Sequence, residues 1–160
     1  METWLRILTI VGALTTGLMA GLYFAFATAV MPALARLDSG SGLEAMQRIN
    51  RAILNPLFLV TFLASGLAGA ALAVSSAWTW DQTGAELRLA GGLLAFAGGL
   101  VLTAAYHVPR NNALESVSRG TPEGDGEWAR YLREWVPANH LRALDCTLSL
   151  VLLLLALDAR

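Results

Sequence analysis

The sequence predicts an all-α fold: a bundle of four transmembrane helices, with short amphipathic helices in the first and third loops. Two observations lead to this prediction. Of the 160 residues, 56% are hydrophobic and only 14% are charged, which is typical of a membrane protein. Four stretches also reach or approach the roughly 20 apolar residues that a helix needs to span a bilayer. They leave no room for a separate soluble domain, so we expect a single membrane domain over residues 1–160.

The four predicted spans cover residues 5–33, 53–77, 87–106 and 138–157. Three of them carry small residues at every fourth position, and such a stripe lets helices approach closely in lipid. We therefore expect the stripes to lie between helices. Their members are Ala13, Gly17, Gly21, Ala25 and Ala29 in the first span, Ser65, Gly69 and Ala73 in the second, and Gly91, Ala95, Gly99 and Thr103 in the third.

Two connecting segments predict amphipathic helices that lie at the membrane interface and cover one end of the bundle. Residues 41–52 and 127–136 repeat apolar side chains at helical spacing, and a turn-rich loop at 120–126 precedes the second segment. The apolar members are Leu43, Met46, Ile49 and Ile53 for the first segment, and Trp128, Tyr131, Leu132 and Trp135 for the second.

The fourth span opens in a polar cluster. The apolar run after Asp145 is too short to cross a bilayer, so we expect the helix to begin near Pro137. Trp135, Asn139 and Arg142 then share one helix face. Arg142 and Asp145 would lie within the membrane, where ionisable groups are costly unless they pair or face a cavity. We expect these two residues to form an ion pair and to mark a functional site.

Polar residues also follow the other spans. Pro109 is expected to turn His107 and Val108 out of the third helix, because proline removes a backbone donor and restricts the residue before it. Three polar segments would then meet at one end of the bundle. They contribute Glu44, Gln47, Asn50 and Asn55; His107, Arg110, Asn111 and Asn112; and Trp135, Asn139, His140, Arg142 and Asp145.

The arginines predict the orientation in the membrane, because cytoplasmic loops are enriched in basic residues. We expect loops one and three in the cytoplasm, both termini outside, and a bacterial inner membrane as the location. The net charge of −1 excludes the basic surface that a nucleic-acid partner would need. The loop arginines are Arg36, Arg48 and Arg51 in the first loop, and Arg110, Arg119, Arg130 and Arg133 in the third.

Two histidines, His107 and His140, stand at the ends of predicted spans. They could transfer protons, bind a metal, or bond to backbone groups. Two histidines are too few for a typical metal site, and HxxxH, ExxH and CxxC spacings are absent from the sequence. We therefore predict no metal, with a transition metal on these two histidines as the alternative. Asn111 and Asn112 could either cap helices or hold a ligand.

Three segments carry a resemblance to a known family. They are residues 21–34, with the sequence GLYFAFATAVMPAL; residues 46–50, MQRIN; and residues 108–114, VPRNNAL, followed by Trp135 and the NHLR of 139–142. In their order and spacing the chain resembles the small four-helix membrane proteins that include the fungal anthrone oxygenases. The sequence departs from the family pattern at His107, where asparagine is more often expected.

The resemblance implies oxidation of an anthrone-like polyphenol to a quinone by O2, without a cofactor. It implies that His140 is the base, tuned by Asp145, and that Arg142 and Asn139 stabilise the oxyanion. The ligands would be an apolar planar molecule and O2 in a lipid bilayer, with a homo-oligomer left open. The residues expected around the substrate are Trp135, Tyr23, Asn50, Asn111, Asn112 and His107.

Two alternatives remain open at this level. One is a membrane module without catalysis that binds or transports quinones or lipids, which would explain the apolar spans and the polar cluster equally well. Helices broken in the middle of the membrane would favour transport, but Pro32, Pro56 and Pro109 all lie near span ends. The other is a metal-dependent oxidase that uses His107 and His140.

Overall fold

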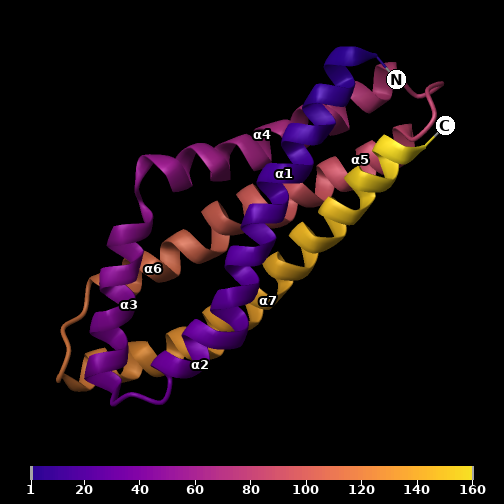
Figure 1. The fold of residues 1–160 in the computed structure, drawn as a ribbon. Helices are drawn as coiled ribbons and strands as arrows, with labels where there is room; N and C mark the ends of the chain where they lie inside the picture. The colour runs from indigo at the N-terminus through magenta and orange to yellow at the C-terminus, as the bar shows by residue number, and fades with distance from the viewer. Residues whose placement is uncertain (1, 160) are drawn as a thin grey trace.

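The computed structural model describes residues 2–159 and consists of helices joined by short loops (Figure 1). Within this range four helices are long and apolar enough to cross a membrane, which confirms the predicted fold class and makes this a membrane protein. The helices run alongside one another in an elongated bundle, with both chain ends at the same end (Figure 1). The four spans are Thr3–Leu34, Pro56–Trp78, Ala85–Glu115 and Pro122–Asp158.

The first and third spans are interrupted by wide π-helical turns. The first span consists of α1 (Thr3–Ala25), the π-helical η1 (Phe26–Val30) and α2 (Met31–Leu34). Turns of this kind follow an i→i+5 pattern and often occur at functional sites. The third span consists of α5 (Ala85–Leu94), the π-helical segments η2 (Ala95–Val101) and η3 (Thr103–His107), and α6 (Val108–Glu115).

The prediction that Pro109 turns the chain out of the third helix is wrong. The span continues through this proline to Glu115. Pro109 stands in the first turn of α6, where its missing N–H is tolerated. The preceding η3 segment changes the hydrogen-bond register immediately before it, so that the helix absorbs the proline without ending.

The fourth span also differs from its prediction. Helix α7 (Pro122–Asp158) begins well before Pro137 and passes through it, so residues 127–136 extend the span and do not form a separate helix. The start is fixed by Thr121, whose Oγ1 accepts a hydrogen bond from Gly124 N at 3.0 Å. Proline in the first helical turn reinforces such a cap. These signals prevail over the turn propensity of residues 120–126.

The amphipathic helix predicted over residues 41–52 is confirmed as α3 (Ser39–Ile53). It lies across the end of the bundle opposite the chain termini (Figure 1). Asp38 Oδ1 caps it by accepting from Ser41 N at 2.9 Å. Its apolar side joins the long extension of α7 in one buried cluster, which consists of Met31, Leu43, Met46, Leu114, Trp128, Tyr131 and Trp135.

Polar contacts join α3 to the end of α6 and to the loop that follows it. Gln47 Nε2 donates to the carbonyl oxygens of Leu114 and Val117, at 2.8 and 2.9 Å. Glu44 pairs with Arg48 at 2.7 Å and also with Arg119. The hydrogen bond from Arg48 holds the pKa of the Glu44 carboxyl below its usual value. Because α4 (Pro56–Trp78) follows α3 after two residues, these contacts also fix the corner between the two helices.

The small-residue stripes are partly buried between helices, as expected. One close approach joins α4 and α5, where a Cβ added at Gly92 would lie 2.5 Å from the carbonyl oxygen of Gly69, a member of the second stripe. Thr16 in α1 shares a buried hydrogen bond of 2.9 Å with Ser65 in α4. By contrast, a Cβ on Gly21 would meet nothing within 4 Å. The stripe of the first span therefore contacts other helices over only part of its length.

The close approach at Gly92 leads to a stability prediction. We expect Gly92→Ala to lower the free energy of unfolding by about 1–3 kcal/mol, because the new methyl group would overlap the backbone of α4. Thermal unfolding in detergent would measure the change. Gly21→Ala is the matched control, since it adds the same methyl group to open space and should leave the unfolding temperature unchanged or slightly higher. Equal behaviour of the two variants would contradict the close approach.

Candidate functional site

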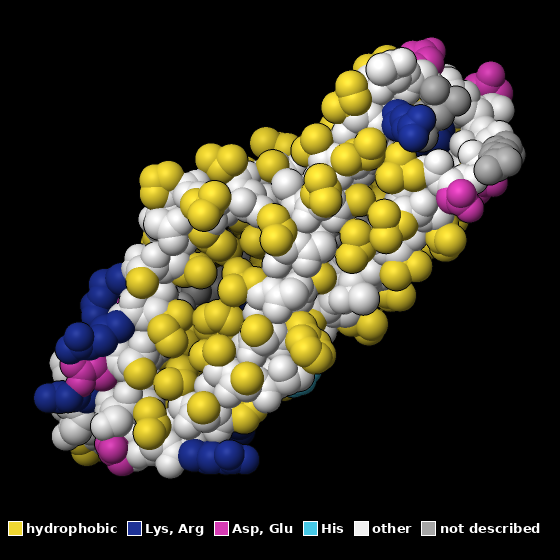
Figure 2. Space-filling view, in the orientation of Figure 1, with side chains coloured by type: hydrophobic (Ala, Val, Ile, Leu, Met, Phe, Trp, Pro, Cys, Tyr) yellow, Lys and Arg dark blue, Asp and Glu magenta, His cyan; other side chains and the backbone are white. Residues whose placement is uncertain are grey.

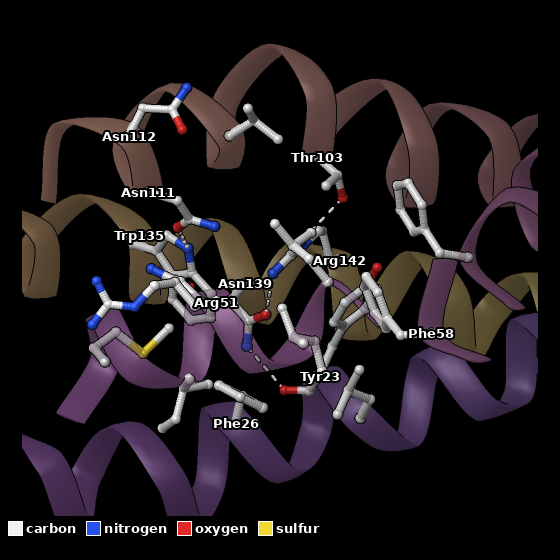
Figure 3. Close-up of a pocket in the computed structure, with 18 of the residues that line it drawn as sticks. Tyr23, Phe26, Arg51, Phe58, Thr103, Asn111, Asn112, Trp135, Asn139 and Arg142 are labelled. Atoms are coloured by element: carbon white, nitrogen blue, oxygen red, sulfur yellow. Dashed lines mark hydrogen bonds between the residues drawn. The ribbon is translucent and has the colours of Figure 1, made fainter. Parts of the chain in front are cut away.

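A cavity of about 410 Å³ (Figure 3) borders α3, in the half of the bundle remote from the chain termini (Figure 1). The surface is hollowed between α1 and α3, with hydrophobic side chains around the opening (Figure 2). Seven of the predicted site residues line the cavity, and several large apolar side chains complete its wall. The seven are Tyr23, Asn50, Asn111, Asn112, Trp135, Asn139 and Arg142, and the apolar wall includes Leu22, Phe26, Met46, Ile49, Phe58 and Phe62.

Arg142 is the cation of the cavity. Its side chain is almost completely buried, with the residue 5% exposed. The guanidinium donates from Nη1 to Thr103 Oγ1 at 3.0 Å and from Nη2 to Asn139 Oδ1 at 2.7 Å. Its Cζ lies 4.1 Å from the centre of the Tyr23 ring, a distance at which the ring attracts a cation. Three helices therefore hold this side chain (Figure 3).

Asn139 connects Arg142 to the first span. Its Nδ2 donates to the Tyr23 carbonyl oxygen at 2.9 Å, while its Oδ1 accepts from Arg142. The orientation of this amide is determined by its partners, because a guanidinium can only donate and a carbonyl can only accept. The contact with Tyr23 lies just before the wide η1 turn, which begins at Phe26. Asn139 thus positions the cation and stabilises the backbone at that turn.

Asn111 forms a second fixed amide. Its Oδ1 accepts from Tyr131 OH at 2.7 Å and from Trp135 Nε1 at 3.0 Å. Tyr131 and Trp135 are stacked with ring centres 5.5 Å apart, and both are buried. The aromatic side of α7 therefore holds the Asn111 side chain at the edge of the cavity.

Several buried polar atoms around the cavity lack a partner within residues 2–159. They are Tyr23 OH, Asn50 Nδ2 and Arg142 Nε. Such atoms are uncommon in folded proteins, because an unpaired buried polar group costs about 1–3 kcal/mol. All three can donate a hydrogen bond. The cavity is therefore suited to a ligand that accepts hydrogen bonds.

The predicted ion pair between Arg142 and Asp145 is wrong. In the part of the chain that the structure describes, no carboxylate lies within ion-pair distance of Arg142, whose contacts go to Thr103 and Asn139. Asp145 is packed against the backbone of η2, where a Cβ on Gly98 would collide with it. It does not line the cavity. Arg142 thus remains a buried cation whose charge the surrounding protein leaves uncompensated.

Neither histidine lines the cavity. His107 is buried with its ring edge-on to Trp135, at 5.3 Å between ring centres, and His140 lies on the exposed face of α7. The geometry therefore gives no support to His140 as the base or to His107 as a substrate contact. Among the described residues, no three His, Cys, Asp or Glu side chains form a group that could hold a metal ion, so the alternative metal site lacks a ligand set.

Sequence reasoning missed three parts of the site. Phe58 and Phe62, stacked at 5.7 Å in α4, could be read only as apolar residues of a span. Thr103 was identified as a member of a small-residue stripe, whereas its hydroxyl accepts the hydrogen bond from Arg142. The direction in which the Thr103 side chain points depends on the π-helical register of η2 and η3. That register has no recognised sequence signal.

The bridging role of Asn139 predicts a loss of stability on its removal. We expect Asn139→Ala to reduce the free energy of unfolding by about 2 kcal/mol, because Arg142 Nη2 and the Tyr23 carbonyl would lose a buried partner. Asn112→Ala is the comparison, since Asn112 is exposed, and should change stability by less than about 0.5 kcal/mol. Chemical denaturation in detergent would measure both, and equal effects would contradict the bridging role.

One comparison with known proteins gives a match. A family model described as anthrone oxygenase matches residues 43–152. The cavity residues on α3, α4, the third span and α7 lie within this range. Comparison with curated proteins and with solved structures gives no match. The match covers most of the chain and confirms the resemblance found in the sequence: this protein belongs to the anthrone oxygenase family.

Proposed function

We propose that this protein is a membrane-embedded oxygenase that converts a planar, anthrone-type polyphenol into a quinone with O2. The observation that supports this most directly is the buried guanidinium of Arg142, which has no carboxylate partner within the described chain. A buried, uncompensated charge is costly, by several kcal/mol. A ligand with a negatively charged oxygen would compensate it, and the substrate anion of this reaction is such a ligand.

The shape of the cavity supports a flat, apolar substrate. Aromatic side chains from three helices line it, from Tyr23 and Phe26 on the first span to Phe58 on α4 and Trp135 on α7. Aromatic walls of this kind contact the faces of fused rings. A volume of about 410 Å³ lies within the range of small-molecule pockets. The substrate class is therefore a compact polycyclic phenol or anthrone.

The chemistry requires little beyond the stabilisation of charge. An anthrone loses a C–H proton readily, because the anion becomes an aromatic oxyanion. Arg142, together with the Asn139 amide that positions it, would stabilise that oxyanion. The electron-rich anion then reacts with O2 itself. One anthrone and one O2 give one quinone and one water, in which one oxygen atom forms the new carbonyl and the other leaves with the two hydrogens of the methylene.

The proton would leave through the polar rim of the cavity. Among the described lining residues the one carboxylate is Glu115, which pairs with Arg51 at the end of α3. Both side chains are partly exposed, so a proton taken up there can pass to solvent. Glu115 therefore takes the place of His140 as the candidate acceptor, because it borders the cavity and His140 does not.

The position of the opening supports a path from the lipid. Leu54 and Leu59 line the cavity and are exposed, at 64% and 38%, and the hollow between α1 and α3 is surrounded by hydrophobic surface (Figure 2). An apolar substrate dissolved in the bilayer could enter without crossing water. By the positive-inside rule the α3 end faces the cytoplasm, with both termini outside the inner membrane of a bacterium.

The first test is O2 consumption by the detergent-purified protein with dithranol, a simple anthrone. We expect uptake above the spontaneous rate and a loss of at least about 100-fold in kcat for Arg142→Met, because a buried donor to an oxyanion typically contributes that much. Methionine fills a similar volume without a buried charge, so the variant should fold. Arg133→Met, an exposed change on the same helix, is the matched control.

Other outcomes separate the alternatives. Unchanged turnover in Arg142→Met would contradict the oxyanion role. Stoichiometric copper, iron or zinc in elemental analysis of the active protein would favour a metal-dependent oxidase. Folded protein that consumes no O2 would leave a quinone- or lipid-binding module as the better interpretation of the same cavity.

A further inference from the structure

We infer that Asn111 is a fixed hydrogen-bond donor that recognises a second oxygen of the ligand, and that Tyr131 and Trp135 hold it in this orientation. The ligand would then be a fused-ring molecule with acceptor oxygens at two edges, one at Arg142 and one at Asn111. The inference rests on the proposed function for the class of ligand, a fused-ring molecule. It adds that this ring system must carry an acceptor oxygen at each of two edges.

The orientation of the Asn111 amide follows from its partners. An indole N–H can donate but cannot accept, so the atom that lies 3.0 Å from Trp135 Nε1 must be the amide oxygen. The same oxygen accepts from Tyr131 OH at 2.7 Å. The amide nitrogen must therefore point away from both rings. Figure 3 shows it turned away from Trp135, into the space between Trp135 and Arg142.

The two aromatic donors are held firmly. Tyr131 is 1% exposed and stacks on Trp128, with ring centres 6.0 Å apart, as well as on Trp135. Trp135 also packs against the His107 ring in a T-shaped arrangement. Rotation of the Asn111 amide would break two buried hydrogen bonds and leave two donors unpaired, at about 1–3 kcal/mol for each. Tyr131 and Trp135 are therefore positioning residues for the Asn111 donor.

The side-chain acceptors that contact Arg142, Tyr131 and Trp135 are already occupied. Asn139 Oδ1 already accepts from Arg142, and Asn111 Oδ1 already accepts twice. Thr103 Oγ1 accepts from Arg142 and donates to the Gly99 carbonyl. Among the described residues, the unpartnered buried atoms of the cavity wall are, by contrast, Tyr23 OH, Asn50 Nδ2 and Arg142 Nε, and each of them can donate. A ligand edge that carries an oxygen would satisfy this site, whereas an edge that carries an N–H would meet a donor.

A pair of matched probes tests this donor pattern. Anthraquinone and acridone are tricycles of almost the same shape, with a carbonyl at one edge; the opposite edge carries a second carbonyl in anthraquinone and an N–H in acridone. We expect the wild-type protein to bind anthraquinone at least about 10-fold more tightly, equivalent to about 1.4 kcal/mol. Acridone fluorescence in detergent-purified protein would report its binding, and displacement would report that of anthraquinone.

The decisive variant is Asn111→Asp. One carboxylate oxygen can still accept from Tyr131 and Trp135, while the other replaces the amide donor with an acceptor. We expect the preference to reverse, so that acridone binds more tightly than anthraquinone. Asn55→Asp is the matched control: Asn55 caps α4 through a bond from Phe58 N at 3.1 Å and does not line the cavity. Aspartate caps equally well, so the preference should stay as in the wild type.

Tyr131→Phe tests the positioning role and serves if Asn111→Asp does not fold. It removes one of the two bonds that fix the amide, so the preference should shrink by a few fold without reversing. A purely structural role would weaken both probes equally and leave the preference unchanged. An unchanged preference in Tyr131→Phe would overturn the inference. So would an unchanged preference in Asn111→Asp, or the absence of binding of either probe to the wild type. Because binding is measured without turnover, a protein that reverses its preference but consumes no O2 would refute the oxygenase and keep the donor.

Discussion

The buried charge of Arg142 is the constraint on which the rest of the site depends. A guanidinium keeps its charge inside a membrane protein, so the surrounding structure must supply acceptors from several directions. Thr103 on the third span and Asn139 on α7 supply oxygens, and the Tyr23 ring on the first span lies against the cation. The same contacts join the first span, the third span and α7. The charge therefore brings polar groups of three helices together at the depth where the cavity lies.

The π-helical turns explain how a bundle of apolar helices can accommodate this polar centre. The η1 turn begins just after Tyr23, and Thr103 is the first residue of η3. A wide turn changes the direction in which the residues beyond it face. Just before η1, the Tyr23 carbonyl oxygen accepts from Asn139 as well as from the backbone N–H of Phe26. The fold thus departs from regular α-helix where the cavity needs side chains in directions that a regular helix would not provide.

Much of the fold and part of the site could be predicted from the sequence. Hydropathy located all four spans, and helical spacing identified α3 and grouped Trp135, Asn139 and Arg142, because these signals depend on local periodicity alone. The long start of α7 was missed, since its cap lies in a segment rich in turn residues. The partners of Arg142 and the exposed position of His140 could not be predicted. Both depend on helix rotation, which neighbouring helices and the π-helical register determine.

The position of α3 has a consequence for the setting in which the protein works. This helix supplies one wall of the cavity through Met46, Ile49 and Asn50, yet it lies across the end of the bundle and continues into α4 after only two residues. The position of α3 along the membrane normal therefore depends on the depth of α4 in the hydrocarbon layer. A thinner or thicker bilayer would tilt α4 or shift it along its axis. Lipid chain length thereby becomes a determinant of the width of the cavity.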